Sequence, residues 1–270
     1  MSWAKVDPIN VADLPEQASP TGSRRVVLNE GTEGFRLSLL TLPPGWTSPY
    51  AGNGLEFHSC HEEVINLEGI LHFGQWRDFT APGYLNHPPY WVHPSDESTE
   101  TGLRLLVKYA GPFDIDYLPF PDGWDGVEFI APAGADRADP RLRGVTGVNL
   151  DDIPWEPVFS QDMRPIQNYE AKTLYRNEAT GWTTWLMRLP AGWRGVGPRR
   201  SWPAGDELFV VDGDLTIDHG AGPVRLTAGS YYCSPDRYVE GGAKDFSETG
   251  CLAVRWTRGA EHLVLPSIRF

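Results

Sequence analysis

Two short stretches in the first half of the chain hold most of the side chains that could bind a metal ion. They read FHSCHEEVINLEG at residues 57–69 and GYLNHPPYWVH at residues 83–93. Imidazole and carboxylate groups together suit divalent first-row metals. We therefore predict a metal site that combines two histidines with one or two carboxylates. Five of the seven histidines of the chain fall on or between these stretches, more than an even scatter would place there: His58, His61, His72, His87 and His93.

The elements that position these side chains are expected to be short β-strands. The chain contains 29 Gly and 24 Pro, which favour turns, and 11 Trp, 10 Tyr and 11 Phe, which favour strands. Apolar runs of strand length, such as FRLSLLTL, EVINLEGILHF, TTWLMRL and CLAVRW, are bounded by Gly, Pro, Asn and Asp. Regular short strands of this kind predict an all-β barrel or jelly roll.

The second half of the chain repeats the first, which predicts a tandem duplication. We expect a first domain at residues 1–111, a surface connection rich in Pro, Gly and Asp at 112–147, and a second domain at 148–270. Four pairs of segments recur in the same order: INVADLP (9–15) and VNLDDIP (148–154), LTLPPGW (40–46) and MRLPAGW (187–193), EEVINLEG (62–69) and DELFVVDG (206–213), ETGLRLLVKYAG (100–111) and ETGCLAVRWTRG (248–259).

Composition narrows the classes of partner. The formal net charge of −13 argues against binding to nucleic acid or to an anionic membrane surface, because both need clustered Lys and Arg. No apolar run is long enough for a membrane helix, and residues 1–17 do not resemble a signal peptide, so we expect a cytoplasmic protein. The three cysteines, Cys60, Cys233 and Cys251, are expected to be free thiols. The expected partner is a small-molecule substrate.

Both halves resemble the cupin superfamily, and the first half is similar to the cupin-like domain of ChrR-type anti-sigma factors. The cupin pattern is His-x-His, three or four residues, Glu, six residues and Gly, followed by a Pro-rich hairpin that ends in a third His. Here His58 stands four residues before Glu62, and Gly69 follows after six more. The second motif matches Gly83, Pro88, Pro89 and His93, with a hairpin one residue shorter. The resemblance implies two tandem cupin domains, which are jelly-roll β-barrels.

The same resemblance, together with the chemistry of the side chains, implies a metal centre held by His58, Glu62 and His93. Such a set leaves coordination positions open and is typical of non-haem Fe(II) sites, so iron is favoured, with Mn, Zn or Ni as alternatives. Glu56 stands where the family has its first histidine. Strand alternation places it on the face of His58, where it is either a fourth metal ligand or a catalytic base; a surface carboxylate is the third option.

Other residues near the two motifs are candidates for substrate binding. Phe57, Trp76, Tyr90 and Trp91 either pack in the barrel or supply an apolar wall for substrate. His61 lies in a turn and is either a solvated side chain, a ligand or a substrate contact. The second copy has no imidazole at the matching positions and is expected to be metal-free and structural; these positions are Arg200, Trp202, Asp206 and Glu240.

The sequence therefore favours a metal-dependent cupin enzyme, with a non-haem Fe(II) dioxygenase as the first hypothesis. Its expected substrate is a small organic molecule that chelates the metal, such as a diketone or an aromatic or polyketide-like compound. One alternative is a non-redox isomerase, cyclase or lyase in which Glu56 acts as the base. Another is a ChrR-like ligand or metal sensor without catalysis. The resemblance also allows a homodimer.

Overall fold

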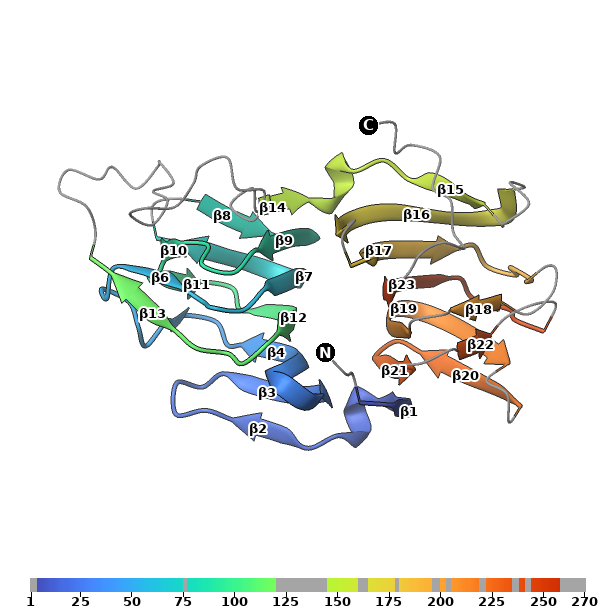
Figure 1. Ribbon diagram of the computed structural model, residues 1–270, viewed down its shortest axis with the longest axis horizontal. Coiled ribbons are helices and arrows are strands. Elements are labelled where there is room, and N and C mark those ends of the chain that lie inside the picture. Colours follow the sequence, from blue (N-terminus) through green and yellow to red (C-terminus); the bar gives the residue numbers. More distant parts are fainter. Residues whose placement is uncertain are drawn as a thin grey trace. The chain divides into compact units, whose positions relative to one another are not determined.

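The chain consists of β-strands, as predicted. The computed structural model describes residues 4–74, 77–119, 145–159, 165–177, 180–195, 200–202, 205–218, 222–234, 238–240 and 244–257. These residues form strands joined by turns and short 3-10 helices, with no α-helix among them (Figure 1). Accordingly, this part of the chain contains no helix that is long and apolar enough to cross a membrane.

The chain divides into two compact units, and the first contains Pro15–Asp152. A smaller sheet in this unit has the order β10 (His93–Pro94), β6 (Leu55–Phe57), β13 (Asp116–Leu118). In the larger sheet β8 (Arg77–Thr80) and β11 (Glu97–Thr99) pair with β7, and β5 (Trp46–Thr47) pairs with β11. Its main path runs β14 (Val145–Asn149), β9 (Gly83–His87), β7 (Glu62–Phe73), β12 (Leu103–Ala110), β4 (Phe35–Leu42), β3 (Arg24–Glu30), β2 (Glu16–Ala18).

The second unit contains Trp3–Leu14 and Ile153–Phe270. Its smaller sheet pairs β18 (Arg200–Trp202) with β22 (Tyr238–Glu240), and β20 (Pro223–Thr227) pairs with β19 of the larger sheet. The main path of that larger sheet runs β1 (Val6–Asn10), β21 (Ser230–Ser234), β19 (Asp206–Asp218), β23 (Cys251–Thr257), β17 (Trp182–Leu189), β16 (Pro165–Asn177), β15 (Glu156–Phe159).

The two larger sheets have the same strand order, which confirms the duplication. Individual hydrogen bonds recur as well. Tyr84 on β9 donates its hydroxyl to Glu63 on β7 at 2.6 Å, and Tyr231 on β21 donates to Glu207 on β19 at the same distance. Because both pairs are buried and occupy equivalent positions, the two copies share their register at the level of single side chains.

The first strand of each copy pairs within the unit formed mainly by the other copy. β1 pairs with β21 in the second unit, and β14, which carries the repeated sequence of β1, pairs with β9 in the first unit (Figure 1). Backbone contacts repeat too, since Val11 N–H donates to Gly229 O and Leu150 N–H donates to Pro82 O. The units therefore differ from the predicted bounds of 1–111 and 148–270, because each unit takes its outermost strand from the other copy.

A glycine at the same turn of each copy explains part of the repeated motif. Gly69 and Gly213 have φ angles of +86° and +78°, which L side chains rarely adopt. A Cβ atom on Gly69 would meet the carbonyl oxygen of Gly102, and one on Gly213 would meet that of Gly250. Only glycine fits at these two positions, because the neighbouring backbone leaves no room for a side chain. Each glycine comes just after a β-bulge, which lies opposite β12 in the first copy and opposite β23 in the second.

Each barrel interior holds its own apolar core. The core of the first unit comes from alternating residues of β4, β7, β9 and β12, with Val64, Leu85, Leu105 and Val107 among its buried members. The three cysteines are buried and form no disulfide bond. This core leaves polar side chains on the same inward face near one end of β7, and these form the candidate site.

Candidate metal centre

Two Glu–His pairs on neighbouring strands form the centre of the site in the first unit. In the smaller sheet, β10 pairs with β6 so that His93 lies directly opposite Glu56. In the larger sheet, β9 pairs with β7 so that His87 lies directly opposite Glu62. Side chains that face each other in this way are neighbours on one face of a sheet. Side chains of both pairs line the same cavity, so the two pairs meet there.

Distances between side-chain atoms show how closely the pairs approach. His93 Nε2 lies 3.6 Å from Glu56 Oε1, and His87 Nδ1 lies 3.2 Å from Glu62 Oε2. One ligand atom from each of Glu56, His58 and His93 falls within 4.8 Å of the others. The same holds for Glu62, His87 and His93, so His93 belongs to both groups.

His58 joins the two pairs from the turn between β6 and β7. Its Nε2 lies 3.9 Å from Glu56 Oε1 and 3.8 Å from Glu62 Oε2. Its Nδ1 lies 2.6 Å from the carbonyl oxygen of Asp114, which can only accept a hydrogen bond. The proton of the neutral ring is therefore on Nδ1, and the lone pair of Nε2 faces the carboxylates. This is the ring orientation that metal-binding histidines generally use.

The cluster is buried and rich in carboxylates. Glu97, on β11, adds a third carboxylate, whose Oε1 lies 3.9 Å from His93 Nδ1. No lysine or arginine in the described part of the chain forms an ion pair with Glu56, Glu62 or Glu97. Burial, opposed by His58 and reinforced by Glu62, raises the pKa of Glu56 to about 7. Burial, with the charges of Glu56 and Glu62, raises the pKa of Glu97 well above its usual value.

Two residues have pKa shifts that favour the forms needed for metal binding. Burial alone would raise the pKa of Glu62, but the hydrogen bond from His87 and the nearby histidines lower it to about 2. Burial, followed by the charge of His87, lowers the pKa of His93 to about 3. At neutral pH Glu62 is therefore ionised and His93 is neutral, which are the protonation states of metal ligands.

This donor set fits a divalent cation. His93 Nε2 is buried and has no hydrogen-bond partner among the described residues, although a buried polar atom normally has one. A cation among His58, Glu62, His87 and His93 would use this nitrogen and would also relieve the repulsion between the buried carboxylates. Mixed imidazole and carboxylate ligands suit Fe(II), Mn(II), Ni(II) and Zn(II).

A cavity of about 430 Å³ opens onto the cluster. This volume is within the range of small-molecule sites, and most of its wall is apolar, as such sites usually are. Glu56, His58, Glu62, His87, His93 and Glu97 line it, together with Leu40, Leu42, Leu71, Phe73, Leu105, Val107, Tyr109 and Phe113. The metal-ligand candidates and an apolar wall thus face the same space.

Four of the five residues predicted to bind substrate lie elsewhere. Phe57, Tyr90, Trp91 and His61 are not among those that line the cavity. Phe57 is out of phase with Glu56 and His58, and Tyr90 is 51% exposed. Trp91 is buried beside His87, with the two rings stacked 6.1 Å apart.

His61 Nε2 lies 2.8 Å from the side-chain nitrogen of Asn86 and does not join the cluster. The remaining candidate, Trp76, lies outside the residues that the structure describes. Residue type alone could not separate aromatic side chains in the cavity from those packed behind the site.

Sequence reasoning missed two members of the site, His87 and Glu97. His87 was counted among the clustered histidines but was not assigned to the metal. Gly83, Leu85 and His87 alternate along β9, and Leu85 is a core residue, so the strand period indicates that His87 also points inward. The inward direction of Glu97 was harder to predict, because β11 contains only three residues and shows no clear alternation.

The second unit has an ion pair where the first has Glu62. Asp206 begins β19 as Glu62 begins β7, and it is fully buried. It accepts hydrogen bonds from Arg255 Nε and Nη2, both at 2.7 Å, and from the hydroxyl of Tyr232. Arg200 pairs with Glu240 in the register that Glu56 has with His93. The side chains of Arg200, Trp202 and Glu240 lie outside the described part of the structure.

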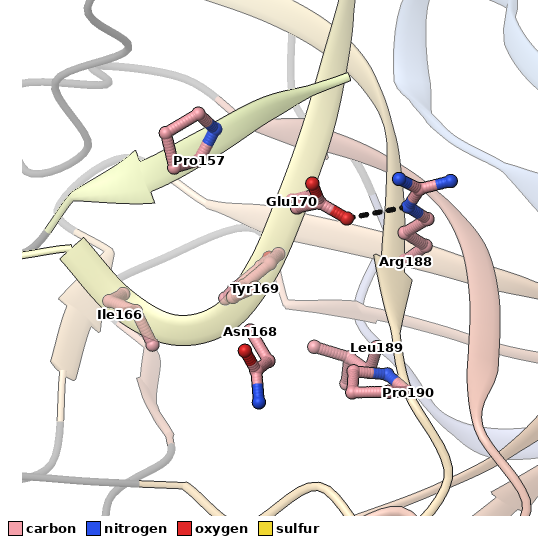
Figure 2. Close-up of a pocket in the computed structure, with 8 residues that line it drawn as sticks. All are labelled: Pro157, Ile166, Asn168, Tyr169, Glu170, Arg188, Leu189 and Pro190. Carbon is pink, nitrogen blue, oxygen red and sulfur yellow. Dashed lines mark hydrogen bonds and ion pairs between the residues drawn. The ribbon is translucent and has the colours of Figure 1, made fainter.

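A second pocket, of about 810 Å³, lies on β15–β17 of the second unit (Figure 2). Its two charged side chains pair with each other, since Arg188 Nε donates to Glu170 at 2.7 Å. The guanidinium of Arg188 also lies 4.2 Å from the ring centre of Trp155. These contacts satisfy the charged groups of the pocket. Among the residues that the structure describes, this pocket has no cluster of potential metal ligands like that of the first unit.

Comparison with solved structures identifies the fold. No family model and no curated protein sequence matches the chain. A candidate dioxygenase from Nostoc punctiforme matches with a TM-score of 0.68 and 15% identity over 97% of this chain and 87% of that one. A variant of oxalate decarboxylase from Bacillus subtilis matches with a TM-score of 0.60 and 10% identity over 97% of this chain and 80% of that one.

A variant of salicylate 1,2-dioxygenase from Pseudoaminobacter salicylatoxidans, in complex with gentisate, has a TM-score of 0.59 and 14% identity over 95% of this chain and 83% of that one. At these identities the likeness establishes the fold alone. The protein is built from two tandem cupin barrels, and proteins with this fold include both dioxygenases and a decarboxylase.

Proposed function

We propose that the protein is a metal-dependent cupin enzyme whose first barrel binds iron(II) and oxidises a small organic substrate that chelates the metal. The observation that carries this proposal is the buried cluster of three histidines with Glu56 and Glu62, which lies with the partly buried Glu97 beside a cavity of about 430 Å³. Among the described residues, the Nε2 of His93 has no hydrogen-bond partner and no lysine or arginine forms an ion pair with these carboxylates, which supports a cation there. The dioxygenases among proteins of this fold support the choice of iron.

In this proposal His58, Glu62, His87 and His93 hold the ion. Bound iron(II) would supply both a Lewis acid for the chelating oxygens of the substrate and redox chemistry with dioxygen. The carbonyl of Asp114 fixes the ring of His58 in a metal-binding orientation. Leu40, Leu42, Leu105 and Val107 supply an apolar wall against which the carbon skeleton of the substrate would pack.

Glu56 favours a second candidate, in which the metal acts without redox chemistry. Burial raises the pKa of its carboxyl to about 7, so that it can take up or release a proton near neutral pH. A group of this kind beside chelated substrate is suited to isomerisation, lyase chemistry or decarboxylation. Oxalate decarboxylases among proteins of this fold are consistent with this candidate.

Oxygen consumption separates the candidates. Protein loaded with Fe(II) is mixed with 1,3-diketones, catechols, hydroxybenzoates and 2-oxo acids in an oxygen electrode, with the His58→Ala/His93→Ala variant as control. Oxygen uptake in step with substrate loss, absent in the variant, supports the dioxygenase. Turnover under argon supports the non-redox enzyme. Ligand binding without product under either atmosphere contradicts an enzyme and favours the ChrR-like sensor.

A further inference from the structure

Arg25 is a basic residue on the wall of the metal-site cavity. It is the second residue of β3 and pairs with Leu40 on β4. Both residues line the cavity that holds the Glu–His cluster, whereas the adjacent Arg24 is exposed and pairs with Glu16 at 3.4 Å. The two arginines therefore lie on opposite faces of one strand, and only Arg25 faces the cavity.

The guanidinium of Arg25 has no acidic partner in the described structure. The titratable and charged groups that act on it are Tyr109 on β12 and Arg36 on β4. Burial lowers its pKa; Tyr109 opposes this effect, and Arg36 adds to it. Burial also holds the pKa of Tyr109 well above its usual value, so its hydroxyl stays neutral. Arg36 in turn lies over the ring of Tyr109, 5.4 Å from its centre. In the described structure neither Arg25 nor Arg36 forms an ion pair with a carboxylate, although Glu62 also acts on Tyr109.

Hydroxyl groups line the cavity near the start of β3. Ser19, Thr21 and Ser23 belong to the lining, and their hydroxyls form a hydrogen-bonded group. Ser19 Oγ lies 2.6 Å from both Thr21 Oγ1 and Ser23 Oγ. Serine and threonine hydroxyls can donate to an anion, and a guanidinium matches a carboxylate with two parallel hydrogen bonds. Together they are the groups from which proteins build carboxylate sites.

We propose that Arg25 and the hydroxyls of residues 19–23 form a carboxylate-binding subsite, and that the substrate is a small organic acid. This inference rests on the proposed function of the same site. The substrate chelates the metal through adjacent oxygens at one end, and Arg25 binds a carboxylate at its other end. The apolar side chains of Leu40, Leu42, Leu105 and Val107 face the carbon chain between them. A neutral diketone or polyketide would offer the guanidinium of Arg25 no carboxylate to bind.

A matched pair of ligands tests the subsite. 2-Oxoglutarate and 2-oxohexanoate carry the same chelating 2-oxo acid group and chains of similar length, but only the first has a distal carboxylate. Their binding to zinc-loaded protein is measured by calorimetry under argon, so that no oxidation occurs. The wild type should bind 2-oxoglutarate at least ten-fold more tightly than 2-oxohexanoate. Equal affinities would overturn the proposal.

Variants then assign the preference to Arg25. Arg25→Met should weaken binding of 2-oxoglutarate 10- to 100-fold and leave 2-oxohexanoate within two-fold. Arg25→Lys keeps the positive charge but not the bidentate geometry, so it should weaken binding of 2-oxoglutarate several-fold. Arg24→Met, on the outer face of the same strand, should match the wild type. Equal weakening of both ligands by Arg25→Met, or no weakening of either, contradicts the subsite.

Metal analysis of the same samples separates failure of this inference from failure of the proposed function. Arg25→Met with full metal content but unchanged ligand preference would overturn the subsite and leave the metal enzyme intact. If the wild type binds no metal, glutarate is titrated into the metal-free protein. Loss of glutarate binding in Arg25→Met would then support the subsite, although the missing metal would contradict the proposed function.

Discussion

At the scale of single residues, the sequence identified Glu56, His58, Glu62 and His93, and the structure brings these four together. Their spacing made this possible, because a short strand and a tight turn leave little freedom in where the side chains point. His87 was harder to predict, since its role depends on the register between β9 and β7. The side chains that line the cavity were not predictable, because aromatic residues favour burial without favouring one particular face.

The structure adds His87 to the expected ligands, and this can be tested by substitution. His87→Ala should reduce affinity for Zn(II) or Fe(II) at least ten-fold, because the variant loses a nitrogen donor opposite Glu62. His61→Ala is the matched control, since His61 lies in the same stretch but outside the cluster. Competition with a chromophoric chelator measures both affinities. Equal affinities in the two variants would remove His87 from the site.

Glu56 should make the stability of the metal-free protein depend on pH. Its pKa is about 7 in the folded state against an ordinary 4.5, so the folded state binds the proton more tightly than the unfolded state. This contribution is full below about pH 4.5 and is lost as the pH rises through 7. Glu56→Gln has no proton to lose. Between pH 5 and pH 8 the wild type should therefore lose about 2 kcal/mol of unfolding free energy relative to Glu56→Gln. Urea unfolding checks this, and parallel pH profiles would contradict it.

At the scale of elements, the sequence predicted the strands and the duplication because apolar runs, turns and glycines recur in the same order. The matching strand orders of the two larger sheets confirm this interpretation. The pairing of β1 with β21 and of β14 with β9 was not predicted. A repeat shows which strands are equivalent but not which copy each first strand pairs with. The sheet of either copy offers a free edge to that strand, so the pairing is known only from the structure.

The repeated glycines give a prediction with controls inside the same chain. Gly69→Ala and Gly213→Ala should each lower the free energy of unfolding by about 3 kcal/mol, since φ is positive and a backbone oxygen blocks the Cβ position. Gly45→Ala and Gly192→Ala, both with φ of +74° and open space around them, should cost only about 1 kcal/mol. Urea unfolding compares the four variants; equal losses would refute the steric argument.

At the scale of the whole molecule, the duplication has kept the fold of both barrels but not their chemistry. The first has a buried Glu–His cluster, and the second has Asp206 paired with Arg255 and Tyr232. A buried ion pair with full hydrogen bonding satisfies its own charges and leaves no free ligand. The alignment of the two copies predicted the loss of histidines, but Arg255 comes from a strand on which nothing indicated such a role.

Removal of residues 1–14 should affect the two units differently. The second unit loses β1, so amide hydrogens of β21 should exchange at least ten-fold faster. The equivalent strand β9 keeps its partner β14 and should be unchanged. Metal content should also stay the same, because every candidate ligand lies in the first unit. Hydrogen-exchange mass spectrometry follows both strands. Unchanged exchange in β21 would contradict the importance of this pairing.

Metal content of the purified, untagged protein tests the central claim most directly. Plasma mass spectrometry should find about one divalent ion per chain in the wild type, and iron would favour the dioxygenase. The His58→Ala/His93→Ala variant should lose this ion, whereas a His61→Ala/His72→Ala variant should keep it. His72 is bound to Asp78 at 2.7 Å, outside the cluster. Equal metal in all three proteins, or none in the wild type, would contradict the metal centre.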